Sequence, residues 1–252
     1  MSLMEKRRIR ITLAYDGTDF VGWQFQINGT SVQEMVERSL KLLTGEFVRV
    51  TGAGRTDSGV HASGQVAHFD TTLLSLPPER FRAAMNTRLP ASIRILESRE
   101  AAPDFHARFD AVERMYRYYL LPLPVVLPFE DRYALQVRGE FPVDRMNRMI
   151  LPLLGTHDFS TFASGTDRND SAVRTVTRAV FYPRGRFLVF EIAANSFLWR
   201  MVRSIVGTVV DLRSKGLGEE EFARVFEARD RSLSGPTAPA KGLFLEKVTY
   251  AE

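Results

Sequence analysis

The sequence predicts an α+β protein built from two ferredoxin-like halves, each with the order strand, helix, strand, strand, helix, strand. Two observations support this class. Stretches such as Arg8–Tyr15 alternate apolar and polar residues as half-buried strands do, and amphipathic helices separate them. The order of elements also recurs in the second half without a repeated sequence. We expect halves at 1–105 and 106–252, a mixed, mostly antiparallel sheet with helices on one face, and a central active-site cleft that makes them one catalytic unit.

The first half is predicted from its helix signals and its alternating stretches. Ser31 followed by Glu34 forms a capping box, and Gly45 is a typical residue at a helix C-terminus. Pro77 and Pro78 fit the first turn of a second helix. The expected elements are a strand at 8–15, a helix from 31 to about 43, strands at 46–50 and 65–70, a helix at 77–87 and a strand at 92–97.

The second half repeats this order with one additional short helix. A proline-rich linker follows its first strand, and a strongly apolar helix precedes the short one. The expected elements are a strand at 114–121, a linker from Pro122 to Pro128, a helix at 143–154, a loop at 155–168, a hairpin of 174–182 with 187–193, the apolar helix at 197–212, the short helix at 219–229 and a last strand at 242–250.

A glycine-rich loop between two strands of the first half carries the strongest sign of a functional site. The stretch 51–64 reads T-G-A-G-R-T-D-S-G-V-H-A-S-G and places Arg55, Asp57 and His61 at the expected tip. Glycine allows unusual backbone angles and the close approach of another molecule. Asp and Gly also suit ordinary turns. The loop is neither a phosphate-binding P-loop nor a dinucleotide fingerprint, because a strand follows it.

Composition limits the classes of function. The chain has 252 residues, a net charge of +4 and no cysteine, which excludes disulfides and thiolate-ligated zinc. Five of the 34 basic residues are lysine and 29 are arginine, a side chain suited to phosphate contact and base stacking. A GC-rich genome would give the same bias. We expect a cytoplasmic location, because no secretory signal and no apolar run of about 20 residues is present.

Asp57 is the best candidate for a nucleophile or base. A carboxylate attacks directly if it stays ionised, and a neighbouring arginine favours ionisation. Arg55 is one candidate partner, and Arg203 is a better one because its charge lies in an apolar helix. The alternative is that Arg203 extends to the surface. Tyr116 on the strand 114–121 suits base stacking, although core packing is the more common role for aromatic residues on such a strand.

Motifs along nearly the whole chain resemble the tRNA pseudouridine synthase A family. The most specific is G-R-T-D-S-G-V-H-A in the glycine-rich loop. The sequence departs from the family pattern at Ser58, where alanine is usual, and at Arg200, where histidine is common. The other matching motifs are Y-D-G-T-D-F-V-G-W-Q-F-Q at 15–26, S-V-Q-E at 31–34, D-F-H-A-R-F at 104–109, R-Y at 117–118 and N-S-F-L-W-R-M-V-R-S-I-V-G at 195–207.

The resemblance implies an isomerase that converts uridine to pseudouridine at positions 38, 39 and 40 of the tRNA anticodon stem-loop. It implies Asp57 as the catalytic aspartate, Arg203 as its ion-pair partner, Tyr116 as the residue stacked on the flipped base and Arg55 as the residue that helps flip it. Leu243 or Leu245 would form the apolar wall of the active site. No cofactor or metal is implied. The resemblance further implies a homodimer, with tRNA lying across both subunits. It implies no association with a membrane. Attack at C1′ and attack at C6 both remain open.

Two other classes of protein account for the sequence less completely. An RNA-binding protein with paired sheets would lack a reason for Asp57 and does not show the expected aromatic signature. A hydrolase acting through Asp57 on a phosphate or glycoside would usually need a second facing carboxylate, and the sequence offers no convincing one.

Overall fold

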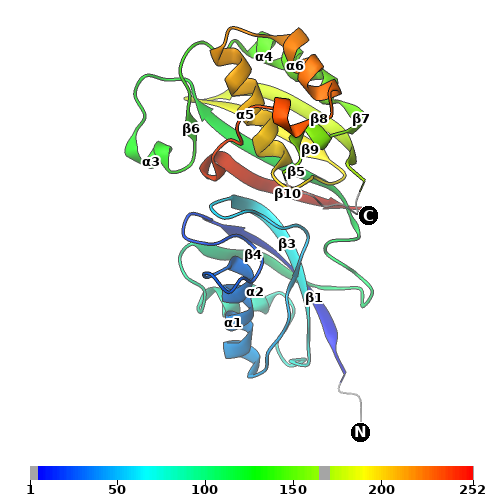
Figure 1. The fold of residues 1–252 in the computed structure, drawn as a ribbon. Coiled ribbons are helices and arrows are strands. Elements are labelled where there is room, and N and C mark those ends of the chain that lie inside the picture. Colours follow the sequence, from blue (N-terminus) through cyan, green and yellow to red (C-terminus); the bar gives the residue numbers. More distant parts are fainter. Residues whose placement is uncertain (1–4, 165–170, 252) are drawn as a thin grey trace. The chain divides into compact units, whose positions relative to one another are not determined.

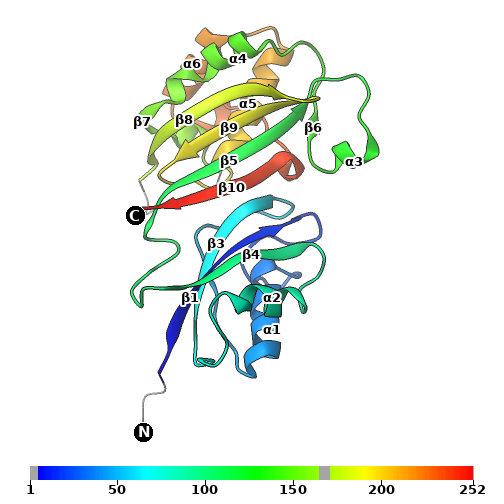
Figure 2. The same ribbon diagram turned by 180° about the vertical axis from the view of Figure 1, so that it is seen from behind.

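The computed structural model describes residues 5–164 and 171–251 and has the α+β class that the sequence predicts. The chain forms two compact units (Figures 1 and 2). The first contains Met1–Val112 and Leu245–Glu252, and the second contains Glu113–Phe244. Each unit combines strands with helices, and each is described by itself below.

The sheet of the first unit is centred on β1 (Arg7–Tyr15). It pairs antiparallel with β3 (His61–Thr71) on one side and with β4 (Ile93–Ala101) on the other. The main path of the sheet runs β4-β1-β3-β10 (Leu243–Tyr250), and the short β2 (Thr51–Gly52) pairs with β3 off this path. The strands β4, β1, β3 and β2 are neighbours in the order of a ferredoxin-like half. The alternation in β1 is borne out, because Ile9, Ile11, Leu13 and Tyr15 are all buried.

The helices of the first unit follow their predicted signals. In α1 (Val32–Thr44) the side chain of Ser31 accepts a hydrogen bond from the backbone N of Glu34. Gly45 ends the helix with φ of 80°, the left-handed conformation that glycine adopts without strain. The second helix, α2 (Arg80–Asn86), begins after the two prolines. Figures 1 and 2 show both helices on the same face of the sheet.

The prediction of a strand at 46–50 is wrong. In the segment 46–52, the two residues that pair with β3 are Thr51 and Gly52, which lie opposite His68 and Ala67. Val48 and Val50 are buried, which explains the strand-like alternation. The last strand, β10 (Leu243–Tyr250), is also a neighbour of β3, so little of that edge remains for the preceding segment.

The second unit has a sheet that is antiparallel except at one edge contact. Its order is β5 (Ala111–Leu121), β9 (Phe187–Ala194), β8 (Val173–Arg184) and β7 (Gly155–Asp158), and all three pairings are antiparallel. The short β6 (Leu135–Gln136) pairs parallel with β5. The predicted hairpin is therefore confirmed as β8 and β9. The predicted loop at 155–168 contains β7 instead, and its last four positions lie outside the described residues.

The helices of this unit are α3 (Pro128–Asp131), α4 (Val143–Ile150), α5 (Met201–Ser214) and α6 (Glu219–Glu227), and α4, α5 and α6 lie on one face of the sheet (Figures 1 and 2). The predicted linker contains α3. The helix predicted at 143–154 ends at Ile150, and a 3₁₀ turn, Leu151–Leu153, follows. The helix predicted from residue 197 begins at Met201, because Arg200 has φ of 60° and interrupts the helical conformation.

Candidate active site

The backbone on both sides of Asp57 is held by buried contacts. The hydroxyls of Tyr15 and Thr56 lie 2.8 Å apart in a buried hydrogen bond. The backbone N of Trp23 donates to the carbonyl of Thr56 at 3.1 Å, and the N of Val60 donates to the carbonyl of Asp57 at 3.1 Å. The residue before Asp57 is thus bound to β1 and to the Trp23 segment, and Asp57 itself begins a tight turn. The backbone that carries the carboxylate is therefore held in place on both sides.

Glycines make this close packing possible. Gly59, in the turn after Asp57, has φ of 76°. A Cβ on Gly52 would lie 2.5 Å from the ring of Trp23, and a Cβ on Gly22 would lie 2.5 Å from the carbonyl oxygen of Thr56. Both distances are too short for any larger residue. The glycines of this region therefore serve the contact between the loop and the Trp23 segment.

The predicted residues of this loop differ in exposure. Asp57 is half-buried, and Arg55 is exposed two residues before it. His61, which the sequence placed at the loop tip, is instead buried as the first residue of β3. Its Nδ1 accepts a hydrogen bond from the backbone N of Gly17 at 3.0 Å and lies 3.1 Å from Oδ1 of Asp16. His61 therefore has a structural role, and Asp57 remains the candidate acid of the loop.

Tyr116 lies on β5, on the face of the strand that also carries Tyr118. Its side chain is 9% exposed, and its ring meets the ring of Phe197 edge to face, with centroids 5.0 Å apart. Tyr118 is fully buried, and its hydroxyl donates to the carbonyl of Pro239 at 2.8 Å. Burial raises the pKa of Tyr118, and the nearby positive charge of Arg203 partly opposes that rise. Tyr118 therefore stays a neutral donor at ordinary pH.

Arg203 lies in the first turn of α5 and is half-buried. Its Nε donates to the carbonyl of Ala238 at 2.8 Å, and its own carbonyl accepts from the N of Ala238 at 3.0 Å. The alternative that this side chain merely extends to the surface does not fit these contacts. Arg203 and Tyr118 therefore both bind the segment that contains Ala238 and Pro239, which lies close against α5.

A glycine in α5 allows this segment to approach so closely. A Cβ on Gly207 would lie 1.7 Å from the carbonyl oxygen of Pro236. Sequence reasoning missed the role of the segment, and its only signal was the pair of prolines after Gly235. Of the two candidate wall residues in β10, Leu245 is fully buried and Leu243 is 6% exposed.

The two positions that depart from the family pattern have local roles. The hydroxyl of Ser58 donates to the carbonyl of Phe20 at 3.2 Å and adds one contact to the loop. The guanidinium of Arg200 lies 4.5 Å from the centre of the Trp199 ring, and both side chains are exposed. This exposed cation and ring lie directly before α5.

Comparison with known proteins identifies the family. A family model described as tRNA pseudouridine synthase matches residues 11–110 and 149–251. The chain belongs to the tRNA pseudouridine synthase family. The chain is 43% identical to tRNA pseudouridine synthase A of Halalkalibacterium halodurans over 238 residues, which cover 94% of this chain and 90% of the relative. It is 43% identical to the protein of that name from Moorella thermoacetica, with 96% and 99% of the two chains covered.

Membership in the pseudouridine synthase family makes the chain an isomerase, as the sequence predicted. The first matched segment contains Arg55 and Asp57, and the second contains Arg203 and Leu245. Tyr116 lies between the two segments. Among residues 5–164 and 171–251, no cluster of three acidic or histidine side chains is placed to hold a metal ion. No helix within these ranges is both long and apolar enough to cross a bilayer.

Proposed function

We propose that this synthase isomerises uridine to pseudouridine at positions 38, 39 and 40 of the tRNA anticodon stem-loop, with Asp57 as the nucleophile. The observation that supports this most strongly is the anchored position of Asp57. The residue before it is hydrogen-bonded to β1 through Tyr15 and to the Trp23 segment, while its own side chain stays half-buried rather than enclosed. A nucleophile held in this way loses little entropy when it meets its target.

The chemistry needs a single carboxylate. An oxygen of Asp57 attacks either C1′ of the ribose or C6 of the uracil, and the bond between C1′ and N1 breaks. The detached ring turns, and C5 bonds to C1′. After attack at C1′ this step displaces the aspartate, whereas after attack at C6 the aspartate stays on the ring and leaves as the C5 proton is removed. A base then removes the proton from C5, and N1 takes up a proton. The carboxylate is regenerated, so the atoms and electrons balance without an external reactant.

The other residues prepare the target base. The uracil must leave the base stack, which costs a few kcal/mol. In the proposal, exposed Arg55 enters the space left by the base, and Tyr116 stacks on the extruded ring. Leu245, or Leu243 beside it in β10, forms the apolar wall of the site. These apolar and aromatic contacts offset part of the cost of extrusion.

Arg203 keeps Asp57 ionised in this proposal. Its Nε is already committed to the carbonyl of Ala238, which fixes the plane of the guanidinium. The two terminal nitrogens can then meet a carboxylate as a fork. A positive charge next to the acid favours the anionic form that attacks.

The proposal includes the setting of the reaction. The enzyme acts in the cytoplasm without cofactor or metal, and it works as a homodimer with tRNA across both subunits. The halves at 1–105 and 106–252 act as one catalytic unit around a central cleft. Size-exclusion chromatography with light scattering tests the dimer, and a monomer that retains full activity would contradict it.

The experiment that tests the reaction is tritium release from tRNA labelled at C5 of uridine. Isomerisation releases one tritium for each pseudouridine and leaves the strand intact. Release confined to substrates with uridine at positions 38–40 is the expected result. Strand cleavage would indicate a hydrolase, and binding without release would indicate a non-catalytic RNA-binding protein.

A further inference from the structure

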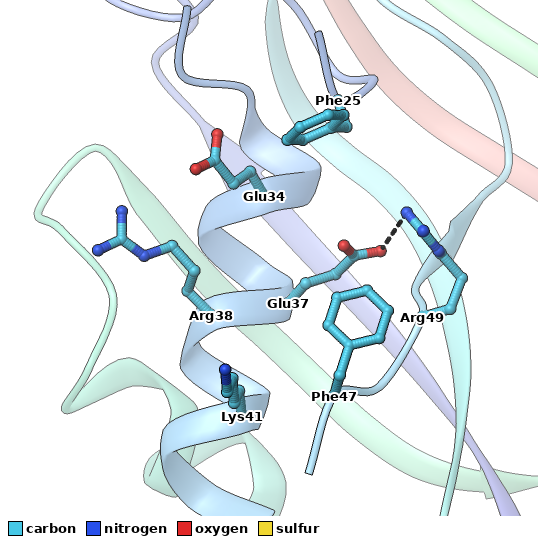
Figure 3. Close-up of a pocket in the computed structure, with 7 residues that line it drawn as sticks. All are labelled: Phe25, Glu34, Glu37, Arg38, Lys41, Phe47 and Arg49. Carbon is cyan, nitrogen blue, oxygen red and sulfur yellow. Dashed lines mark hydrogen bonds and ion pairs between the residues drawn. The ribbon is translucent and has the colours of Figure 1, made fainter. Parts of the chain in front are cut away.

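A shallow pocket on the exposed side of α1 has no role in the proposed reaction. It lies wholly within the first unit, and Figure 3 shows the side chains that line it. Five of its lining residues carry a formal charge and two are aromatic. The lining residues are Phe25, Glu34, Glu37, Arg38, Lys41, Phe47 and Arg49.

The two aromatic side chains of the pocket are unusually exposed for phenylalanine. Phe25 is 53% exposed and Phe47 is 61% exposed. Figure 3 shows them on either side of the carboxylate of Glu37. The guanidinium of Arg49 lies 5.1 Å from the centre of the Phe47 ring. Aromatic rings next to arginine form a surface on which a planar base stacks well.

The carboxylate of Glu37 forms the floor of the pocket. The residue is 5% exposed, and its Oε1 accepts hydrogen bonds from Gln33 Nε2 at 3.1 Å, from the backbone N of Val50 at 3.0 Å and from Arg49 at 3.4 Å. Within the described residues, every hydrogen bond recorded for this carboxylate ends on Oε1. Oε2 therefore remains as an acceptor for an N–H group of a ligand.

Buried Gln33 holds the pocket in shape. Its Oε1 accepts from the backbone N of Phe25 at 3.0 Å, and its Nε2 donates to the carbonyl of Val50 at 2.9 Å and to Glu37. One amide thus joins the loop that carries Phe25, the helix α1 and the segment that follows Phe47. The backbone that frames the pocket is therefore held together by the fold.

Three cations are among the residues that line the pocket. Arg38 and Lys41 lie one turn apart on α1, and Arg49 lies on the opposite wall. The pocket also contains two negative charges, on half-buried Glu34 and buried Glu37. The excess of positive charge suits a phosphate group at the rim.

We propose that this pocket binds an unpaired nucleotide of the RNA substrate, outside the uridine that reacts. The base lies against Phe25 and Phe47 and donates an N–H to Oε2 of Glu37, and its phosphate meets Arg38, Lys41 or Arg49. This inference rests on the proposed function for the identity of the RNA. A second copy of this chain is the competing occupant, and the experiment below separates the two.

The test compares the double variant Phe25→Ala/Phe47→Ala with Leu42→Ala. Leu42 is 70% exposed on the same helix and does not line the pocket. Fluorescence anisotropy measures the binding of full-length tRNA and of a labelled single-stranded RNA hexamer. The double variant should bind both RNAs roughly 5- to 100-fold more weakly, as expected for the loss of base–aromatic stacking. Its turnover number on saturating tRNA should stay within about twofold of the parent, and Leu42→Ala should change neither quantity.

Glu37→Gln provides a second test, because the amide oxygen can replace Oε1 while the NH₂ group replaces the acceptor Oε2. It should weaken hexamer binding and leave the melting temperature nearly unchanged. Unchanged affinity in both the double variant and Glu37→Gln overturns the proposal. A double variant that dissociates into monomers, with affinity restored at high protein concentration, assigns the pocket to a second copy instead. Hexamer binding is measured without turnover. The result therefore tests the pocket even if the protein does not catalyse the proposed reaction.

Discussion

The hydroxyl of Tyr15 lies 2.8 Å from the hydroxyl of Thr56, and both side chains are buried. This hydrogen bond connects the last residue of β1 to the residue directly before Asp57. Burial raises the pKa of Tyr15, so its hydroxyl stays protonated and the bond persists at any pH at which the enzyme would be assayed. The position of the proposed nucleophile is therefore tied to the central strand of the first unit.

Replacing Tyr15 by Phe should lower the turnover number several-fold with little change in KM. The variant leaves the hydroxyl of Thr56 without its buried partner, which costs about 1–3 kcal/mol of stability and loosens the loop. Steady-state kinetics and thermal unfolding measure the two effects. Tyr250→Phe is the matched control, because it removes a hydrogen bond to the carbonyl of Ala107 elsewhere in the same unit. Equal losses of turnover in both variants would argue against a specific role for Tyr15.

Gly207→Ala should destabilise the protein and reduce activity. The new Cβ would lie 1.7 Å from the carbonyl oxygen of Pro236 and would push away the segment that binds Arg203 and Tyr118. Overpacking of this kind costs about 1–3 kcal/mol. In an open helix, the same change would stabilise by about 1 kcal/mol. Ser214→Ala, at the exposed end of α5, is the control, and a Gly207→Ala protein with raised melting temperature would refute the contact.

His68 should make the protein less stable in mild acid. Burial, together with the charge of Arg8 and nearby His106, lowers the pKa of His68 to about 4. The unfolded chain binds a proton near pH 6.5, while the folded chain does not. Stability from this group is therefore present above about pH 6.5 and falls as the pH drops toward 4.

The variant His68→Asn tests this pH dependence. The asparagine oxygen can accept the hydrogen bond that the backbone N of Ala107 gives to His68 Nδ1 at 3.1 Å. Urea unfolding between pH 7 and pH 4 should show a shallower loss of stability in the variant than in the parent. Parallel curves would mean that other groups cause the acid sensitivity.

How much of the fold the sequence reveals depends on whether the signal is local. Ser31 and Gly45 predicted both ends of α1, because caps are made by the chain around them. The start of α5 was not predicted correctly. The apolar stretch that predicted the helix gives no sign that Arg200 adopts a left-handed conformation. The strand predicted at 46–50 is absent because the edge of β3 is shared with β10, which lies almost 200 positions further along the chain.

The candidate site divides in the same way. The motif around Asp57 predicted the loop, and the alternation of β5 correctly placed Tyr116 and Tyr118 on one face. The contacts that hold the candidate site residues in place were not predicted. The bond from Tyr15 to Thr56 and the contacts of Arg203 with Ala238 join distant positions that carry no shared pattern.

Binding of tRNA should weaken as salt increases. Arginine side chains that neutralise phosphates release counterions, so the logarithm of affinity falls linearly with the logarithm of salt concentration. Filter binding of tRNA to the Asp57→Asn variant at several salt concentrations measures the slope without turnover. A flat response would contradict an RNA substrate held through its phosphates.

Tritium release by Asp57→Asn tests the central claim most directly. Asparagine keeps the size of the side chain and removes the nucleophilic carboxylate. Asp144→Asn, at an exposed position of α4, is the control for loss of an acid elsewhere. We expect Asp57→Asn to bind tRNA with parental affinity and to release no tritium from C5-labelled uridine, while Asp144→Asn releases it at the parental rate. Release by Asp57→Asn at the parental rate would show that another group attacks the substrate.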